Sequence, residues 1–125
     1  MVENNELTLG MDLGGTNLFF RLEAPERLLA SGSMATSQDF STQLKDIYEN
    51  LVREFGAIHT VSLGVPGPVK DNVMGPSFPL GTREQFTFAR CFKGLSRLIV
   101  KNDLFMALAA DCLLYTSDAA DDTCC

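Results

Sequence analysis

The spacing of apolar residues changes from two to three or four near residue 37, and this change constrains the fold more than any other feature. Before it, the stretch "ELTLGMDLG" carries apolar residues at alternate positions (Leu7, Leu9, Met11 and Leu13), which predicts a strand. The stretches "NLFFRLEA" and "RLLASGSM" predict two more short strands, separated by the turn residues "PE". Three neighbouring strands with tight connections predict an antiparallel meander.

The residues after the change predict a helix. Apolar residues in "SQDFSTQLKDIYENLVREF" recur three and four apart, which gives a helix one apolar face. Ser37, Asp39 or Ser41 could cap its start, and Gly56 suits its C-terminal end. The residues of the apolar face are Phe40, Leu44, Ile47, Leu51 and Phe55.

The rest of the chain predicts an alternation of strands and helices. "HTVSLGV" and "RLIVKN" predict strands, whereas "PGPVKDN" and "VMGPSFPLGT" are rich in proline and glycine and predict irregular loops. "REQFTFARCFKGL" predicts a helix that ends near Gly94, and "DLFMALAAD" predicts the start of another. Antiparallel strands followed by strand–helix units predict an α/β fold with a mixed sheet of about five strands.

The last fourteen residues, "CLLYTSDAADDTCC", differ from the chain before them. They hold three of the four cysteines and no basic residue, and "CLLYTSDAAD" resembles one reading frame of an adapter used in DNA-sequencing libraries. We therefore expect residues 1–111 to be one lobe of a longer protein (the parent protein) and residues 112–125 to be an artefactual tail. Without the tail, 13 acidic residues face 10 basic ones and a single cysteine remains. Mild acidity excludes no class of partner, but one cysteine excludes a disulfide framework or a cysteine zinc cluster.

The chain offers no sign of membrane insertion or secretion. Apolar residues make up 46% of it, enough for a core, yet no apolar run approaches the ~20 residues that span a bilayer. The start "MVENNELTLG" lacks the basic residues and apolar core of a secretion signal. These observations predict a cytoplasmic protein with no membrane partner.

The first candidate site is "DLGGTN", residues 12–17, at the end of the first predicted strand. Gly14 and Gly15 can take positive φ and present bare backbone N–H groups, and Thr16 adds a hydroxyl donor. Such a loop can hold a phosphate chain, and Asp12 could hold a hydrated magnesium ion. The stretch also fits an ordinary Gly-Gly hairpin turn, and these two interpretations do not exclude each other.

Two further motifs follow predicted strands. In "LGVPGPV", Gly64 and Gly67 flank Val65-Pro66 and leave room for a ligand, although a plain strand-ending turn is the better explanation of this segment alone. In "VKNDLFMALAA", Asn102 and Asp103 lie at the carboxyl end of a strand, where ligand clefts form in open α/β sheets. Asp103 could accept a proton from a hydroxyl substrate and Asn102 could bond that substrate, but either residue could instead cap a helix.

The order Asp-x-Gly-Gly-Thr, Gly-x-Pro-Gly-Pro-Val, Asn-Asp resembles bacterial glucokinases and the related ROK sugar kinases of the hexokinase and actin-like ATPase superfamily. The resemblance covers roughly residues 7–111. It implies an RNase H-like N-terminal lobe, with ATP and sugar bound between this lobe and a second one. It also implies that Asp103 is the catalytic base and that the substrate-binding residues are Asn102, Asp103, Gly64, Pro66 and Gly67. The implied residues of the first phosphate loop are Asp12, Gly14, Gly15, Thr16 and Asn17, with Asp12 near Mg²⁺.

The chain departs from the glucokinase pattern in one sugar-site motif. Glucokinases typically carry Asn-Leu-Pro-Trp after the Pro-Gly-Pro strand, and the Asn contacts the sugar. Here the stretch is "SFPL", with Ser77 in place of Asn and Leu80 in place of Trp. We expect Ser77 to keep a hydrogen bond to a sugar hydroxyl, whereas the identity of the sugar is left open. An arginine often found soon after Gly-Gly-Thr is also out of register, since Phe19 lies near that position.

The resemblance implies an enzyme that phosphorylates a hexose, with glucose the first candidate, using ATP and Mg²⁺. It implies a homodimeric parent protein and no nucleic-acid partner. The second phosphate loop and the adenosine site would lie beyond this chain, so we expect the chain alone to be inactive. A sugar-sensing ROK-type transcriptional regulator is an alternative, although those proteins usually begin with a helix-turn-helix and here the first strand begins within ten residues of Met1. A non-sugar ATPase of the same superfamily is another, which would need the first loop but not Asn102-Asp103.

Overall fold

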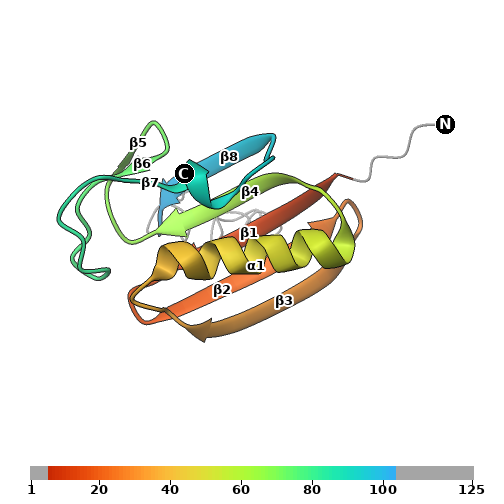
Figure 1. Ribbon diagram of the computed structural model, residues 1–125, viewed down its shortest axis with the longest axis horizontal. Coiled ribbons are helices and arrows are strands. Elements are labelled where there is room, and N and C mark those ends of the chain that lie inside the picture. The colour runs from red at the N-terminus through yellow and green to blue at the C-terminus, as the bar shows by residue number, and fades with distance from the viewer. Residues whose placement is uncertain (1–5, 104–125) are drawn as a thin grey trace, which may run out of the picture.

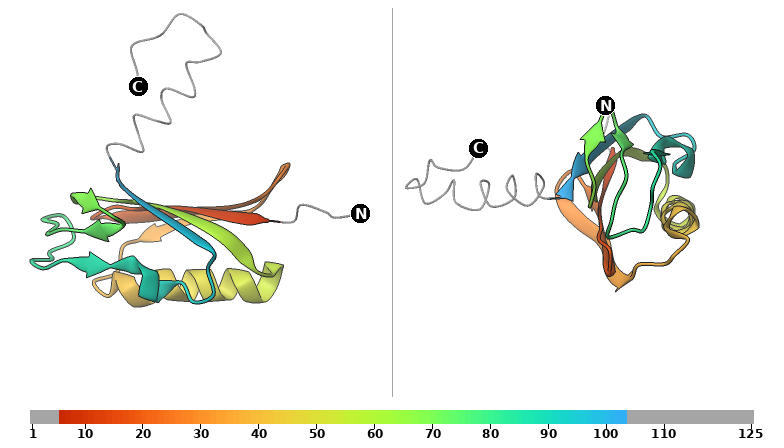
Figure 2. Two further views of the ribbon diagram at one scale, coloured as in Figure 1. Left: turned by 90° about the horizontal axis from the view of Figure 1, so that it is seen from above. Right: turned by 90° about the vertical axis from the view of Figure 1, so that its left-hand side faces the viewer.

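The computed structural model describes residues 6–103, which form a five-stranded sheet with one long helix along one face (Figures 1 and 2). The strands of this sheet are β1 (Leu7–Leu13), β2 (Asn17–Ala24), β3 (Arg27–Ala35), β4 (Ile58–Val65) and β8 (Arg97–Asn102). Their order is β3-β2-β1-β4-β8, in which β1, β2 and β3 form an antiparallel meander and β4 and β8 run parallel to β1. The predicted mixed α/β sheet of five strands is therefore confirmed.

The helix α1 (Phe40–Phe55) confirms the prediction from the apolar spacing. Of the three candidate caps, Asp39 is the N-cap, because its carboxylate accepts a hydrogen bond from the Thr42 N–H at 3.2 Å. At the other end Gly56 has a φ of +104°, and its N–H donates to the Val52 carbonyl at 2.8 Å. The buried residues of α1 are Phe40, Leu44, Ile47, Tyr48 and Leu51.

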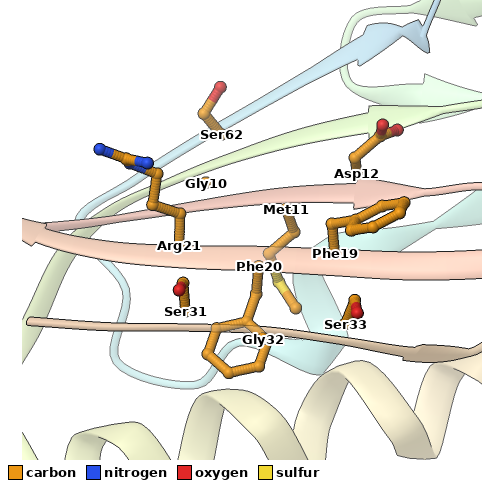
Figure 3. Close-up of a pocket in the computed structure, with 10 residues that line it drawn as sticks. All are labelled: Gly10, Met11, Asp12, Phe19, Phe20, Arg21, Ser31, Gly32, Ser33 and Ser62. Carbon is orange, nitrogen blue, oxygen red and sulfur yellow. The ribbon is translucent and has the colours of Figure 1, made fainter. Parts of the chain in front are cut away.

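The two faces of the five-stranded sheet differ in chemistry because side chains alternate along each strand. The face toward α1 is apolar, and Met11 and Phe20 point to it (Figure 3). Asp12, Arg21 and Ser62 point to the opposite face, where they line an open groove of about 580 Å³. The buried residues of β1, β2 and β4 are Leu7, Leu9, Met11, Leu13, Leu18, Leu22, Ile58, Val61, Leu63, Gly64 and Val65.

A second, three-stranded sheet forms where the sequence predicted irregular loops and part of a helix. Its strands are β5 (Val69–Lys70), β6 (Val73–Met74) and β7 (Phe86–Thr87), in antiparallel order. The turn between β5 and β6 consists of Asp71 and Asn72, whose φ angles are +55° and +64°. Left-handed Asp and Asn residues are typical of a tight hairpin turn, so "KDN" marks a hairpin rather than an irregular loop.

The helix predicted within residues 83–95 is wrong, since that stretch contains β7 and only a four-residue 3₁₀ helix, Phe88–Cys91. The physical reason is aromatic packing. The ring centroid of Phe86 lies 5.2 Å from that of Phe40 and 4.6 Å from that of Phe88, in edge-to-face arrangements. Extended backbone at Phe86 brings these rings together, and such aromatic contacts outweigh a weak helix preference.

Two predictions lie outside the described part of the chain: the helix over residues 104–111 and the artefactual tail over residues 112–125. Within residues 6–103, no helix has both the length and the apolar character needed to cross a membrane.

Candidate functional site

The first phosphate-loop motif forms the hairpin between β1 and β2. The Gly14 N–H donates to the Asn17 carbonyl at 2.9 Å, which closes the turn. Thr36, just after β3, holds the turn from the side: its hydroxyl donates to the Gly14 carbonyl at 2.7 Å and its N–H to the Thr16 carbonyl at 2.9 Å. Gly15, Thr16 and Asn17 are exposed. The loop is therefore both a hairpin and a braced, solvent-facing set of backbone groups.

Gly14 and Gly15 lie where a Cβ atom would come very close to neighbouring atoms, and neither has a positive φ. Among the described residues, the glycines with positive φ lie elsewhere, so Gly14 and Gly15 do not use the left-handed conformation that is open to glycine. A Cβ on Gly15 would lie 2.9 Å from the Pro79 Cβ and 3.0 Å from the Pro79 carbonyl oxygen. A Cβ on Gly14 would lie 3.0 Å from the Asn17 carbonyl oxygen. Backbone can thus approach backbone here only because both side chains are absent.

The carboxylates of Asp12 and Asp103 come together at the carboxyl ends of parallel strands. Asp12 pairs with Gly64 between β1 and β4, and Val65 pairs with Asn102 between β4 and β8, so the three strand ends are adjacent. Burial raises the pKa of Asp12 above its ordinary value of 3.8, and the negative charge of Asp103 raises it further. Two residues far apart in sequence therefore form one acidic site.

This pKa shift predicts the effect of removing the Asp12 charge on stability. A carboxyl group whose pKa is raised by folding lowers the free energy of unfolding once it is ionised, and this penalty disappears below the unfolded pKa. Asp12→Asn should therefore raise the free energy of unfolding at pH 7, by less than about 1 kcal/mol because the group is exposed and screened by solvent. The difference should shrink as the pH falls toward 3.8.

Urea unfolding of the two proteins across this pH range measures the effect. Asp46→Asn, which removes an exposed carboxylate from α1, is the matched control and should show no such trend. A stability gain for Asp12→Asn that stays constant down to acidic pH would contradict the raised pKa of Asp12.

The expected sugar-site residues form a connected floor beside this acidic pair. The Asn102 side-chain amide donates to the Gly67 carbonyl at 2.8 Å. Gly67 is buried, and a Cβ there would lie 2.9 Å from the Met74 Cγ and 3.2 Å from the Ser77 Cβ. The Ser77 hydroxyl donates to the Pro66 carbonyl at 2.7 Å. Gly64, in β4, lies buried under the same strand ends.

Ser77 is buried and already has hydrogen-bond partners. Its side chain is only 1% exposed, and its hydroxyl, besides donating to Pro66, accepts a hydrogen bond from the Leu80 N–H at 3.3 Å. The Ser77 N–H donates to the Thr82 hydroxyl at 2.9 Å and helps to close the hairpin between these two residues, while the expected bond from Ser77 to a sugar stays a prediction. Pro79 in that hairpin packs on Gly15, so the hairpin links the expected sugar-site residues to the loop between β1 and β2.

The described residues do not enclose one complete site. Asp12 borders the groove on the open sheet face, whereas Asn102 borders a separate cavity of about 440 Å³ with Asn72 and Lys101. Gly15 borders a third cavity, of about 270 Å³, together with exposed Phe78. The helix that Asp103 would cap lies outside the described residues, so its alternative role as an N-cap stays a prediction.

Sequence reasoning missed three residues that organise this site. Thr36 and Pro79 brace the phosphate loop, and no local motif around either residue indicates that contact. The third is Asn72, whose side chain bonds the outer edge of β8. Its signal was the Asp-Asn pair, which favours a hairpin turn.

Comparison with known structures identifies the fold. No protein-family model matches the sequence, and no curated protein matches it either. The chain is similar to a glucokinase from Balamuthia mandrillaris solved with glucose, with a TM-score of 0.74 and 16% identity over 92% of this chain and 34% of that one. It is similar to a ROK hexokinase from Thermus thermophilus, with a TM-score of 0.65 and 25% identity over 84% of this chain and 38% of that one. It is also similar to a ROK-family glucokinase from Streptomyces griseus solved with glucose and AMPPNP. That match has a TM-score of 0.61 and 24% identity over 78% of this chain and 33% of that one.

The chain thus spans about a third of the length of the structures it matches. The matched portion is the N-terminal one, which carries the RNase H-like sheet of the actin-like ATPase fold. The described chain therefore has the fold of the N-terminal portion of glucokinases and ROK-family hexokinases.

Proposed function

We propose that this chain is the N-terminal lobe of an ATP-dependent sugar kinase that phosphorylates a hexose hydroxyl, with glucose the first candidate. The observation that carries the proposal is that Asp12 and Asp103 lie at the adjacent carboxyl ends of β1 and β8, on either side of β4, in a chain with a sugar-kinase fold. Asp12 belongs to the proposed phosphate loop, and Asp103 follows Asn102 of the proposed sugar site. Phosphoryl transfer from a nucleotide to a sugar needs the two binding sites to be adjacent in this way.

Each side of the proposed site has a distinct task. The exposed backbone N–H groups of Gly15 and Thr16 bind phosphate oxygens, and the Thr16 hydroxyl adds a donor. Asn102, held by the Gly67 carbonyl, orients the sugar. Asp103 accepts the proton from the attacking sugar hydroxyl as that oxygen bonds to the terminal phosphorus of ATP, and ADP leaves on the opposite side.

The residues present fit a magnesium ion bound mainly through water and phosphate. Within residues 6–103 no group of three metal-binding side chains is found, so a fully protein-made cage is absent from the described part. Mg²⁺ commonly uses one or two carboxylates and keeps several waters. Asp12 supplies one carboxylate, exposed near the end of β1 and beside the loop that would hold the phosphates. When bound, the ion supplies neutralisation of phosphate charge.

The proposal includes a homodimeric parent protein and a cytoplasmic location, which rest on the family resemblance. It also includes the expectation that this chain alone turns over no sugar.

An ADP-release assay on the parent protein, run with ATP and a panel of hexoses, tests the function. A kinase should release ADP only when a hexose is present, and this chain alone should stay at background. ADP release that is independent of sugar would identify the non-sugar ATPase instead. Sugar binding measured by calorimetry without any ADP release would identify the sugar-sensing regulator.

A further inference from the structure

The edge strand β8 is held on its outer side by a side chain instead of a strand. In the described part of the sheet, β8 pairs with β4 on one side only. On the other side, the Asn72 Nδ2 donates to the Leu98 carbonyl at 2.8 Å, and the Val100 N–H donates to the Asn72 Oδ1 at 2.9 Å. One amide thus makes a donor and an acceptor bond of the kind that a neighbouring strand would make.

Asn72 is suited to this contact by its backbone as well as its side chain. It lies in the left-handed region at a φ of +64°, in the turn between β5 and β6, and Asn tolerates this conformation better than most residues. The small sheet lies beside the C-terminal part of β8 in both views (Figures 1 and 2). Glycine would keep the turn but lose both bonds, and aspartate would lose the donor to the Leu98 carbonyl.

The strand that Asn72 holds leads directly to the proposed sugar-binding and catalytic residues. Val100 precedes Asn102 by two residues, which is about 7 Å of extended chain. Asn102 is itself anchored to the Gly67 carbonyl, just before β5. The segment from Gly67 to Asn72 therefore bonds the C-terminal part of β8 at two places, through the Asn72 side chain and through the Gly67 carbonyl. Asn72, Val100 and Asn102 also line the cavity of about 440 Å³.

We propose that Asn72 is a positioning residue that fixes the end of β8 and thereby places Asn102 and Asp103 for sugar phosphorylation. The inference rests on the proposed function for its kinetic part. The proposed phosphate loop lies on the hairpin between β1 and β2, and β4 separates these strands from β8. Replacing Asn72 should therefore change kcat and the KM for the sugar but not the KM for ATP.

The test uses Asn72→Gly and Asn72→Asp in the parent protein, with Asp71→Gly as the matched control. Asp71 is the other left-handed residue of the same turn, so its replacement by glycine leaves the Asn72 amide in place. Hydrogen exchange at the Val100 amide and the NMR resonance of the Asn102 side-chain amide report on the strand end. Steady-state kinetics, taken well below the thermal midpoint, give kcat and the KM values for sugar and ATP.

Asn72→Gly should speed exchange at Val100 by about tenfold, the effect of losing both neutral hydrogen bonds, and Asn72→Asp should speed it less, because its carboxylate can still accept from the Val100 N–H. They should also shift the Asn102 resonance, lower kcat by about tenfold and raise the sugar KM. The ATP KM should stay within about twofold, and Asp71→Gly should resemble the wild type. A purely structural role of Asn72 would lower the thermal midpoint without raising the sugar KM more than the ATP KM.

Unchanged exchange at Val100, or faster exchange with unchanged kcat and an unchanged Asn102 resonance, would overturn the inference. A parent protein that phosphorylates no hexose would instead contradict the proposed function. In that case the Val100 and Asn102 signals still decide whether Asn72 holds the strand end.

Discussion

Asp103→Asn should lower the kcat of the parent protein by roughly 10²–10⁴-fold, the usual contribution of a general base. An amide cannot take the proton of the sugar hydroxyl, although it keeps the size and much of the hydrogen bonding of the carboxylate. Asparagine is also an acceptable N-cap, so a purely structural role of Asp103 would survive the change. The sugar KM should change far less than kcat, and the thermal midpoint should barely move.

The measurement is the sugar-dependent ADP release of both proteins over a range of sugar concentrations. Asp46→Asn removes an exposed carboxylate from α1 and should leave kcat unchanged. If Asp103→Asn keeps kcat within about threefold of the wild type, Asp103 is a helix cap, and the proposed mechanism loses its base.

Gly15→Ala should raise the KM for ATP by about 10- to 100-fold while leaving the sugar KM nearly unchanged. The added Cβ would lie 2.9 Å from the Pro79 Cβ and 3.0 Å from the Pro79 carbonyl, which is closer than real Cβ contacts allow. The loop or the hairpin with Pro79 must therefore move, and displacements of about 1 Å cost up to about 10² in rate or binding at such sites. Titration of the parent protein with ATP at saturating sugar measures this effect.

Gly10→Ala is the matched control for this prediction. Gly10 lies in the same strand as Asp12, and a Cβ there would meet its nearest neighbour, the Arg21 carbonyl oxygen, at 3.9 Å, an ordinary contact distance. Its ATP affinity should equal that of the wild type. Equal ATP affinities for Gly15→Ala and Gly10→Ala would show that the loop between β1 and β2 does not bind the nucleotide.

The elements with a regular apolar spacing were predicted from the sequence. The meander, α1 and the strands β4 and β8 were correct because alternation and the three-to-four spacing reflect burial on one face of each element. The stretch from Pro66 to Cys91 was not predicted. Its strands have two residues each, too short for periodicity, and the extended backbone at Phe86 is stabilised by the distant ring of Phe40.

The roles of the candidate site residues stay predictions, and the contacts between them could not be predicted from the sequence. Gly15 and Asn102 were singled out from local patterns, and in the structure Gly15 lies against Pro79 and Asn102 bonds the Gly67 carbonyl. The contacts themselves join residues far apart in sequence, such as Gly15 with Pro79, and no local pattern reports them. Ser77 lies at the position where the resemblance places a sugar-contacting Asn. Its hydroxyl is buried and donates to the Pro66 carbonyl, a contact that no local pattern reports either.

A crystal structure of the parent protein with glucose and a non-hydrolysable ATP analogue would test the proposed site. We expect one sugar hydroxyl within about 3.2 Å of the Asp103 carboxylate, the hydrogen-bond reach of a general base. We also expect the sugar to contact Asn102 and Gly67, and the phosphates to lie over the loop that contains Gly15. A sugar bound without contact to Asp103, or phosphates bound away from that loop, would contradict the proposed site.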